Sequence, residues 1–215
     1  CSFVNGGKLI NPIIIDRIQD SQGNTIFNSE SRYCKNCKKI SYTSKNLPVI
    51  DDSFEQVFSS QTAYQITSML EGAIQRGTGK GLRELKLDLA GKTGTTNKNT
   101  DTWFIGFTSN LVVGVYIGHD EPKSLGRYET GAKTAMPVFK KFIKQAINKS
   151  DARPFKVSKD IKMMVVNSKT GKKAEYGSDN NIIEAFKTEN LDKNSFEQNE
   201  NLNYKLNNNN IFNFY

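Results

Sequence analysis

The 215-residue sequence has little of the chemistry that builds metal or disulfide sites, with three cysteines and one histidine. Three cysteines cannot staple a chain of this length, which excludes a small disulfide-framed protein. Cys34, Cys37 and His119 also fall short of the four ligands that a structural zinc site needs. We therefore predict no metal site, and the sequence indicates no other cofactor.

Long hydrophobic runs are missing as well. The longest apolar stretch, residues 111–117, is far shorter than the roughly 20 residues of a membrane-spanning helix and is typical of one buried strand. Hydrophobic residues make up 36% of the chain, and its 16 glycines bring the total near that of ordinary globular domains, so a single core is expected. Because the sequence starts at Cys1 without a leader, we expect a segment of a longer protein.

The formal net charge of +8 raises the question of a nucleic-acid partner. The lysines are spread along the chain, and the densest group, between Lys133 and Lys149, falls on a predicted amphipathic helix, where a solvated face explains it. Zinc-finger spacing, an arginine-rich arm and RNA-stacking aromatics are all missing from the sequence. We predict no nucleic-acid partner; a basic module that binds another polyanion, such as a cell wall, stays open as an alternative.

The first third of the chain predicts a hairpin, an irregular insertion and a helix. Two β-rich runs, residues 8–18 and 25–27, enclose a glycine-containing turn. Residues 29–57 show no periodicity and are interpreted as an irregular insertion. Apolar residues at three- and four-residue steps then predict a helix from Ser60, a candidate N-cap, to a stop at Gly77.

The middle of the sequence predicts an antiparallel sheet and a second helix. Strand candidates lie at 87–96, 103–108 and 111–118, and the two-residue gap between the last two indicates a hairpin. Pro137 and the apolar residues after it predict a helix, and a further strand is expected at 163–166. The order of helix, three strands and helix predicts an α+β fold, an antiparallel sheet flanked by helices, rather than alternating βαβ units.

We divide the chain into a domain of residues 1–150, an extension of residues 151–187 and a tail of residues 188–215. The tail is rich in asparagine, including a run at 207–210. It cannot bury enough apolar surface to offset its chain entropy, so we expect it to be disordered.

The triplet Lys92-Thr93-Gly94, followed by Thr95, is the most informative motif. A strand at the edge of a cleft can dock an extended peptide through its backbone groups, and Gly94 lets the peptide backbone come close. The hydroxyl groups of Thr93 and Thr95 can bind a carboxylate, and Lys92 supplies positive charge beside it.

Structural roles also explain residues in this region. On an ordinary edge strand, Lys92 would be a solvated lysine. We expect Trp103 and Phe104 in the core, and Asp101 as a turn cap without a catalytic role.

The motif lies within a longer series of segments that resembles the class A, bifunctional penicillin-binding proteins. The resemblance runs in order through residues 1–187. Its segments are residues 3–8, 12, 15–18, 23–24, 75–79, 90–97, 103–106, 124–127, 131–135, 154–155 and 183–186.

This resemblance implies the C-terminal part of a transpeptidase domain with a β-lactamase-like fold, active in peptidoglycan synthesis. Its activity would be acyl transfer by a serine on a D-alanyl-D-alanine stem peptide, with β-lactams as the other ligands. The resemblance assigns Lys92 and the backbone N–H of Thr95, in an oxyanion hole, to catalysis, and Thr93, Gly94 and Thr95 to substrate binding. It also implies the periplasmic face of a bacterial inner membrane, with a polymerase (glycosyltransferase) domain and membrane contact in a missing N-terminal part.

The sequence departs from the family in one decisive respect, because no Ser-x-x-Lys occurs in it. We therefore predict that the 215-residue chain alone is inactive, since it has no nucleophile with a lysine base. The triplet Ser44-Lys45-Asn46 follows the 3–8 segment, whereas the family's Ser-x-Asn precedes it, so we treat this copy as coincidence. His119 stands where the family more often has an aromatic residue. The alternative is a non-catalytic remnant that docks a peptide or partner protein.

The two cysteines of the insertion form a disulfide candidate. The resemblance implies an oxidising periplasm, where Cys34 and Cys37 would form a disulfide that closes a short loop. Their spacing in a loop permits the ~5.5 Å Cα separation that a disulfide prefers.

Overall fold

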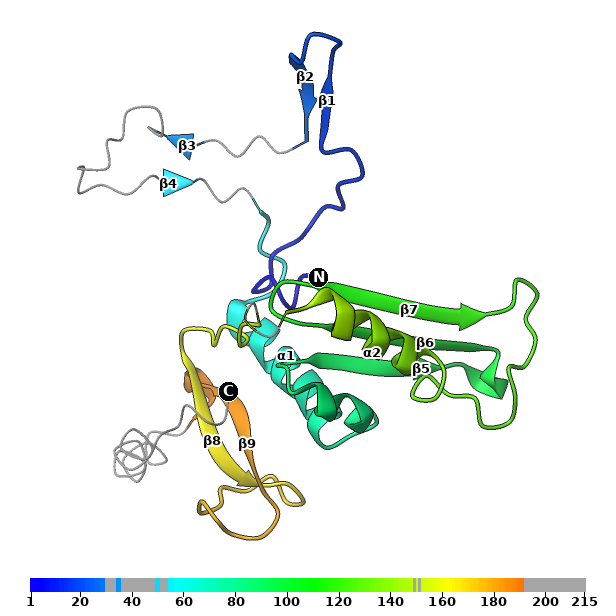
Figure 1. Cartoon of the computed structure of the whole chain (residues 1–215). Helices are drawn as coiled ribbons and strands as arrows, with labels where there is room; N and C mark the ends of the chain where they lie inside the picture. Colours follow the sequence, from blue (N-terminus) through cyan, green and yellow to red (C-terminus); the bar gives the residue numbers. More distant parts are fainter. Residues whose placement is uncertain (30–33, 36–48, 51–53, 149, 151, 192–215) are drawn as a thin grey trace.

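A three-stranded antiparallel sheet forms the centre of the computed structural model, which describes residues 1–29, 34–35, 49–50, 54–148, 150 and 152–191 (Figure 1). Its strands are β5 (Ala90–Thr95), β6 (Asp101–Phe107) and β7 (Val112–Gly118), in the order β5-β6-β7. All three strands, and the hairpin that joins β6 to β7, were predicted from the sequence. The α+β fold class is confirmed.

Helix α2 (Ala135–Ala146) packs against β6 and β7 on one face of the sheet (Figure 1). The core of this contact is the ring pair Phe104 and Phe139, both fully buried, with centroids 4.7 Å apart. Gly106 makes room for these rings, since a Cβ there would lie 2.6 Å from Phe139 Cζ and 2.7 Å from Phe104 Cε1. The close fit fixes α2 against the centre of the sheet.

Helix α1 (Ser60–Gln75) lies against β5, and a 3-10 helix, η2 (Lys80–Leu85), follows it. The helix begins at Ser60 as predicted, but its N-cap is Ser59 and not Ser60: the Ser59 hydroxyl oxygen accepts a hydrogen bond from Thr62 N–H at 3.2 Å. Ala63 and Ile74 are buried as the periodicity predicts, but Met69 is 60% exposed.

A hairpin of β8 (Ile161–Asn167) and β9 (Asn181–Lys187) packs beside α1 (Figure 1). The sequence predicted β8 but not β9. Phe155 joins this extension to the sheet through an edge-on contact with Phe107, 5.7 Å between centroids. Gln65 on α1 donates a hydrogen bond to the Ala185 carbonyl at 3.0 Å. A short 3-10 helix, η5 (Thr188–Asn190), ends the described part of the extension, and residues 192–215 of the predicted tail lie outside it.

The N-terminal hairpin projects away from the sheet (Figure 1). Its strands are β1 (Arg17–Gln19) and β2 (Thr25–Asn28), so the strand in the first β-rich run is much shorter than predicted. Two-residue strands β3 (Cys34–Lys35) and β4 (Val49–Ile50) pair within the insertion. Cys37 and the triplet 44–46 lie outside the described residues, so the disulfide stays a prediction.

Strand alternation corrects one core prediction. Phe104 is fully buried beneath α2, but Trp103 is 42% exposed because neighbouring strand residues point to opposite faces. On that opposite face Trp103 contacts Tyr116, with ring centroids 4.8 Å apart. Within the described residues, no helix has the length and apolar character needed to cross a membrane.

The tight packing at Gly106 gives a stability prediction. Gly106→Ala should destabilise the chain by about 1–3 kcal/mol, because the added methyl group overlaps two buried rings that cannot both move aside. Urea unfolding measures the change in the free energy of unfolding. Gly114→Ala on β7 is the matched control, since its Cβ would meet only Ile105 Cγ1 at 3.9 Å. Equal stability of the two variants would contradict the packing argument.

Candidate active site

The Lys-Thr-Gly strand, β5, has a hydrogen-bonded strand neighbour on one side only within the described residues. Its register on β6 pairs Gly94 with Trp103 and Thr95 with Thr102. The Thr96 N–H continues the ladder to the Asp101 carbonyl at 3.0 Å. Since the bonding direction alternates along an antiparallel strand, the backbone N–H and C=O groups of Thr93 and Thr95 point away from β6. These groups are therefore directed to the open edge of the sheet.

Lys92 and Thr93 come together at this edge. The exposed Lys92 ammonium donates to the Thr93 carbonyl at 2.9 Å and to Thr93 Oγ1 at 3.4 Å. Thr93 Oγ1 in turn lies 3.0 Å from Thr78 Oγ1, in the turn after α1. One cation and two hydroxyl groups therefore form a cluster that suits a carboxylate. Sequence reasoning did not assign Thr78, although the segment 75–79 that contains it was part of the resemblance.

Thr95 is exposed, and its hydroxyl is engaged by a different part of the chain. Thr95 Oγ1 accepts a hydrogen bond from the Gly131 N–H at 3.1 Å. Gly131 lies so close to the sheet that a Cβ there would be 2.4 Å from the Trp103 carbonyl oxygen and 2.6 Å from that of Gly94. The loop before α2 therefore packs against the end of β5, and only glycine fits at position 131.

A hydrogen-bonded turn follows the strand. The Asp101 carboxylate accepts from Tyr116 OH at 2.8 Å and from Thr100 Oγ1 at 3.0 Å, and Thr96 Oγ1 accepts from the Asp101 N–H at 2.8 Å. The bond from Tyr116, followed by that from Thr100, holds the pKa of Asp101 below its usual value. The same bond to Asp101 raises the pKa of Tyr116. Asp101 thus serves as the turn cap that the sequence predicted.

A hollow of about 200 Å³ lies beside Lys92. Apolar side chains supply most of its wall, so the Lys92 stem lies against an apolar surface. The lining residues are Cys1, Phe3, Val4, Leu70, Lys92, Ile105, Phe107 and Val112.

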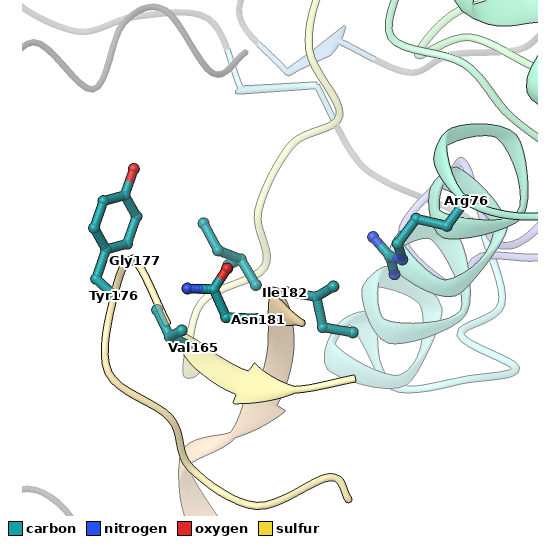
Figure 2. Close-up of a pocket in the computed structure, with 7 residues that line it drawn as sticks. Arg76, Val165, Tyr176, Gly177, Asn181 and Ile182 are labelled. Atoms are coloured by element: carbon teal, nitrogen blue, oxygen red, sulfur yellow. The ribbon is translucent and has the colours of Figure 1, made fainter. Parts of the chain in front are cut away.

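A larger hollow of about 400 Å³ lies between the end of α1 and the β8–β9 hairpin. Figure 2 shows Arg76 on the helix side and Tyr176, Asn181 and Ile182 on the hairpin side. The Arg76 guanidinium is paired with Glu184 at 3.0 Å. None of the Lys-Thr-Gly residues lines this hollow, so it is separate from the candidate site.

A second Lys-Thr-Gly triplet, residues 169–171, and a Ser-Asp-Asn triplet, residues 178–180, lie in the connection between β8 and β9. Both are exposed and make turn contacts: the Ser168 N–H donates to the Asn180 carbonyl at 2.7 Å, and Thr170 Oγ1 accepts from the Lys172 N–H at 3.3 Å. The same triplet sequences therefore form ordinary turns when they do not lie on an edge strand. His119 is exposed directly after β7, and the described residues contain no cluster that could hold a metal ion.

Comparison with known proteins agrees with the geometry of the candidate site. Residues 2–144 match the family model of the penicillin binding protein transpeptidase domain. The chain belongs to the penicillin-binding protein transpeptidase family. The resemblance to class A penicillin-binding proteins is confirmed, and it concerns the C-terminal part of such a protein.

Relatives of this transpeptidase family member are penicillin-binding proteins 1A. The chain is 38% identical to that of Rickettsia conorii, covering 99% of this chain and 26% of the relative. It is 40% identical to that of Rickettsia prowazekii, covering 88% of this chain and 24% of the relative. The crystal structure of penicillin-binding protein 1A from Haemophilus influenzae superposes with a TM-score of 0.70 at 32% identity, covering 86% of this chain and 30% of that one. The chain thus spans about a quarter of the length of the curated relatives it matches.

One carboxyl group on α1, the helix that packs against β5, has a raised pKa. Burial raises the pKa of Glu71 on α1 to about 7, and the negative charge of Asp88 adds to the increase. The folded state therefore holds this proton up to a higher pH than the unfolded chain, whose carboxyl has the ordinary value of 4.5. Between these two values the unfolded state releases the proton first, so stability falls as the pH rises through that window.

Glu71→Gln removes this titration. It should stabilise the chain at pH 8 by about 1 kcal/mol or more relative to the parent, and by less at pH 5. Urea unfolding at the two pH values measures this difference. Glu84→Gln is the control, because a hydrogen bond from Lys140 lowers the pKa of the exposed Glu84 carboxyl, so its removal should bring no gain at pH 8. The same effect of Glu71→Gln at both pH values would contradict the argument.

Proposed function

We propose that this chain supplies the carboxylate-binding and oxyanion-stabilising side of a peptidoglycan DD-transpeptidase. The observation that carries the proposal is the edge of β5, where the Lys92 ammonium and the Thr93 hydroxyl lie together and the Thr95 backbone points outward. The second part of the site, a serine nucleophile with its lysine base, is not contained in this sequence, which has no Ser-x-x-Lys.

The substrate in this proposal is a stem peptide that ends in D-alanyl-D-alanine. The peptide docks as an added strand on β5, bonded to the outward backbone groups of Thr93 and Thr95. Lys92 and the Thr93 hydroxyl bind the terminal carboxylate, and Thr78 orients that hydroxyl through the 3.0 Å contact. A β-lactam carries a carboxylate next to its reactive amide and takes the same place.

The Thr95 N–H acts on the charge that develops during acyl transfer. When the serine oxygen attacks the penultimate carbonyl, negative charge moves to the carbonyl oxygen, and an outward N–H at Thr95 can stabilise it. The C–N bond then breaks, and the terminal D-alanine leaves as an amine that takes up the proton from the serine. An amine of a second stem peptide then attacks the acyl carbon, the bond from that carbon to the serine oxygen breaks, and the proton lost by the amine returns to the serine oxygen, which completes the cross-link.

The wider context of the proposal follows from the relatives. In it, the segment belongs to a bifunctional enzyme with a glycosyltransferase domain, placed at the periplasmic face of the bacterial inner membrane. Membrane contact is then made by a part of the protein outside this sequence. The similarity to penicillin-binding proteins 1A over 99% of the chain supports this placement.

Lys92→Ala tests the proposal in the natural gene product that contains this segment. The variant should lower the second-order rate of acylation by penicillin at least about tenfold, because a charge-assisted contact worth about 1.5–3 kcal/mol is lost. Lys92→Arg should restore the rate only in part, since guanidinium is larger and planar. Thr95→Ala should cost less than Lys92→Ala, because the backbone N–H survives. The rate is followed by intact-protein mass spectrometry.

Two controls separate the alternatives. Lys141→Ala removes one lysine from the exposed surface of α2 and should leave the rate unchanged. The 215-residue chain alone should gain no mass with penicillin, because it lacks the nucleophile; a stable single adduct would show that the nucleophile lies within it.

If the natural product is not acylated at all, the segment is a non-catalytic remnant. Acylation of Lys92→Ala within about twofold of the parent would place the carboxylate site elsewhere.

A further inference from the structure

We propose that Asn99 is a positioning residue for acyl transfer, which holds the loop of residues 124–131 against the end of the Lys-Thr-Gly strand. This inference rests on the proposed transpeptidase function. Asn99 ends η3 (Asn97–Asn99), the short turn that follows β5.

Asn99 makes three hydrogen bonds to this loop. Its side-chain amide donates to the carbonyls of Gly126 and Arg127, both at 2.9 Å. Its own carbonyl accepts from the Leu125 N–H, also at 2.9 Å. One residue therefore fixes three consecutive residues that lie 26 to 28 positions further along the chain.

The loop returns to the strand at a second point. Four residues after Arg127, the Gly131 N–H donates to Thr95 Oγ1 at 3.1 Å. A Cβ at Gly131 would come within 2.6 Å of the Gly94 carbonyl oxygen, so the loop backbone rests directly on the strand. The two points of contact are joined by residues 96–98 on one side and residues 128–130 on the other. The two chain segments and the two contacts therefore form a closed ring that includes Thr95, at the end of the strand.

This ring controls the direction of the Thr95 backbone. The hydrogen bond between Gly131 and Thr95 ties only the C-terminal end of the loop to the strand. The Asn99 contacts tie its N-terminal end, and the bonds among Thr96, Asp101 and Tyr116 hold the intervening turn. Since misplacement of a reacting group by about 1 Å can cost on the order of a hundredfold in rate, a fixed loop matters for the Thr95 N–H.

The chemistry of position 99 explains why asparagine suits it. Its backbone has φ 53°, a left-handed conformation that asparagine tolerates better than most residues. Its amide nitrogen carries two hydrogens, one for each carbonyl. Aspartate has the same shape but donates neither bond, and glycine accepts the conformation but has no side chain. Asn99→Asp and Asn99→Gly therefore remove the bonds in two different ways.

The test uses the natural gene product that contains this segment, with penicillin as the probe. Asn99→Gly and Asn99→Asp should lower the acylation rate at saturating penicillin by about fivefold or more. The final acylated fraction and the melting temperature should stay near those of the parent. A merely structural role would instead lower the acylated fraction and leave the rate of the competent molecules unchanged. Lys98→Gly is the matched control, since Lys98 has φ 63° in the same turn, and it should acylate like the parent.

Amide exchange in the 215-residue chain tests the contact itself. Asn99→Gly should increase the exchange rate of the Leu125 and Gly131 amides by about tenfold or more, whereas Lys98→Gly should not. Acylation by both Asn99 variants within about twofold of the parent, or a loss of acylated fraction alone, would overturn the inference. A parent protein that penicillin does not acylate would overturn the proposed function and the catalytic role of Asn99 with it, while faster exchange would still establish the contact.

Discussion

The register between β5 and β6 is the constraint on which the candidate site depends. It places Lys92 opposite Ile105 and Thr93 opposite Phe104, so that the backbone groups of Thr93 and Thr95 point to the open edge. A shift by one residue would turn these groups into the ladder and move every side chain to the other face. The polar site therefore exists only because the apolar partners of β6 keep this pairing.

The core beneath α2 keeps the register in place. Phe104 and Phe139 pack at an interplanar angle of 56° where Gly106 leaves space, and Gly131 allows the loop before α2 to reach the strand end. The two glycines therefore have different roles. Gly106 leaves room for aromatic rings in the core, and Gly131 lets a loop backbone contact the strand. Both contacts involve β6, the strand that pairs with β5.

The sequence predicted the central sheet and both helices well, because apolar periodicity reflects burial directly. It was wrong about Trp103, since alternation tells which residues share a face but not whether that face is covered. It missed β9, where the strand follows a polar turn, and it placed the N-cap of α1 one residue late. The roles of Thr78, Gly131 and Asn99 could not be predicted, because their partners lie 15 to 36 residues away and periodicity carries no such information. The Lys-Thr-Gly letters alone were also insufficient, since the copy at 169–171 forms an exposed turn.

In the proposed site, the edge of β5 binds a carboxylate and stabilises an oxyanion. A crystal structure of the natural gene product acylated by penicillin tests this most directly. The carboxylate of the bound penicillin should lie within about 3.2 Å of Lys92 Nζ or Thr93 Oγ1, and the acyl oxygen should lie equally close to the Thr95 backbone nitrogen. A penicillin carboxylate bound away from β5, or an acyl oxygen facing other donors, would contradict it.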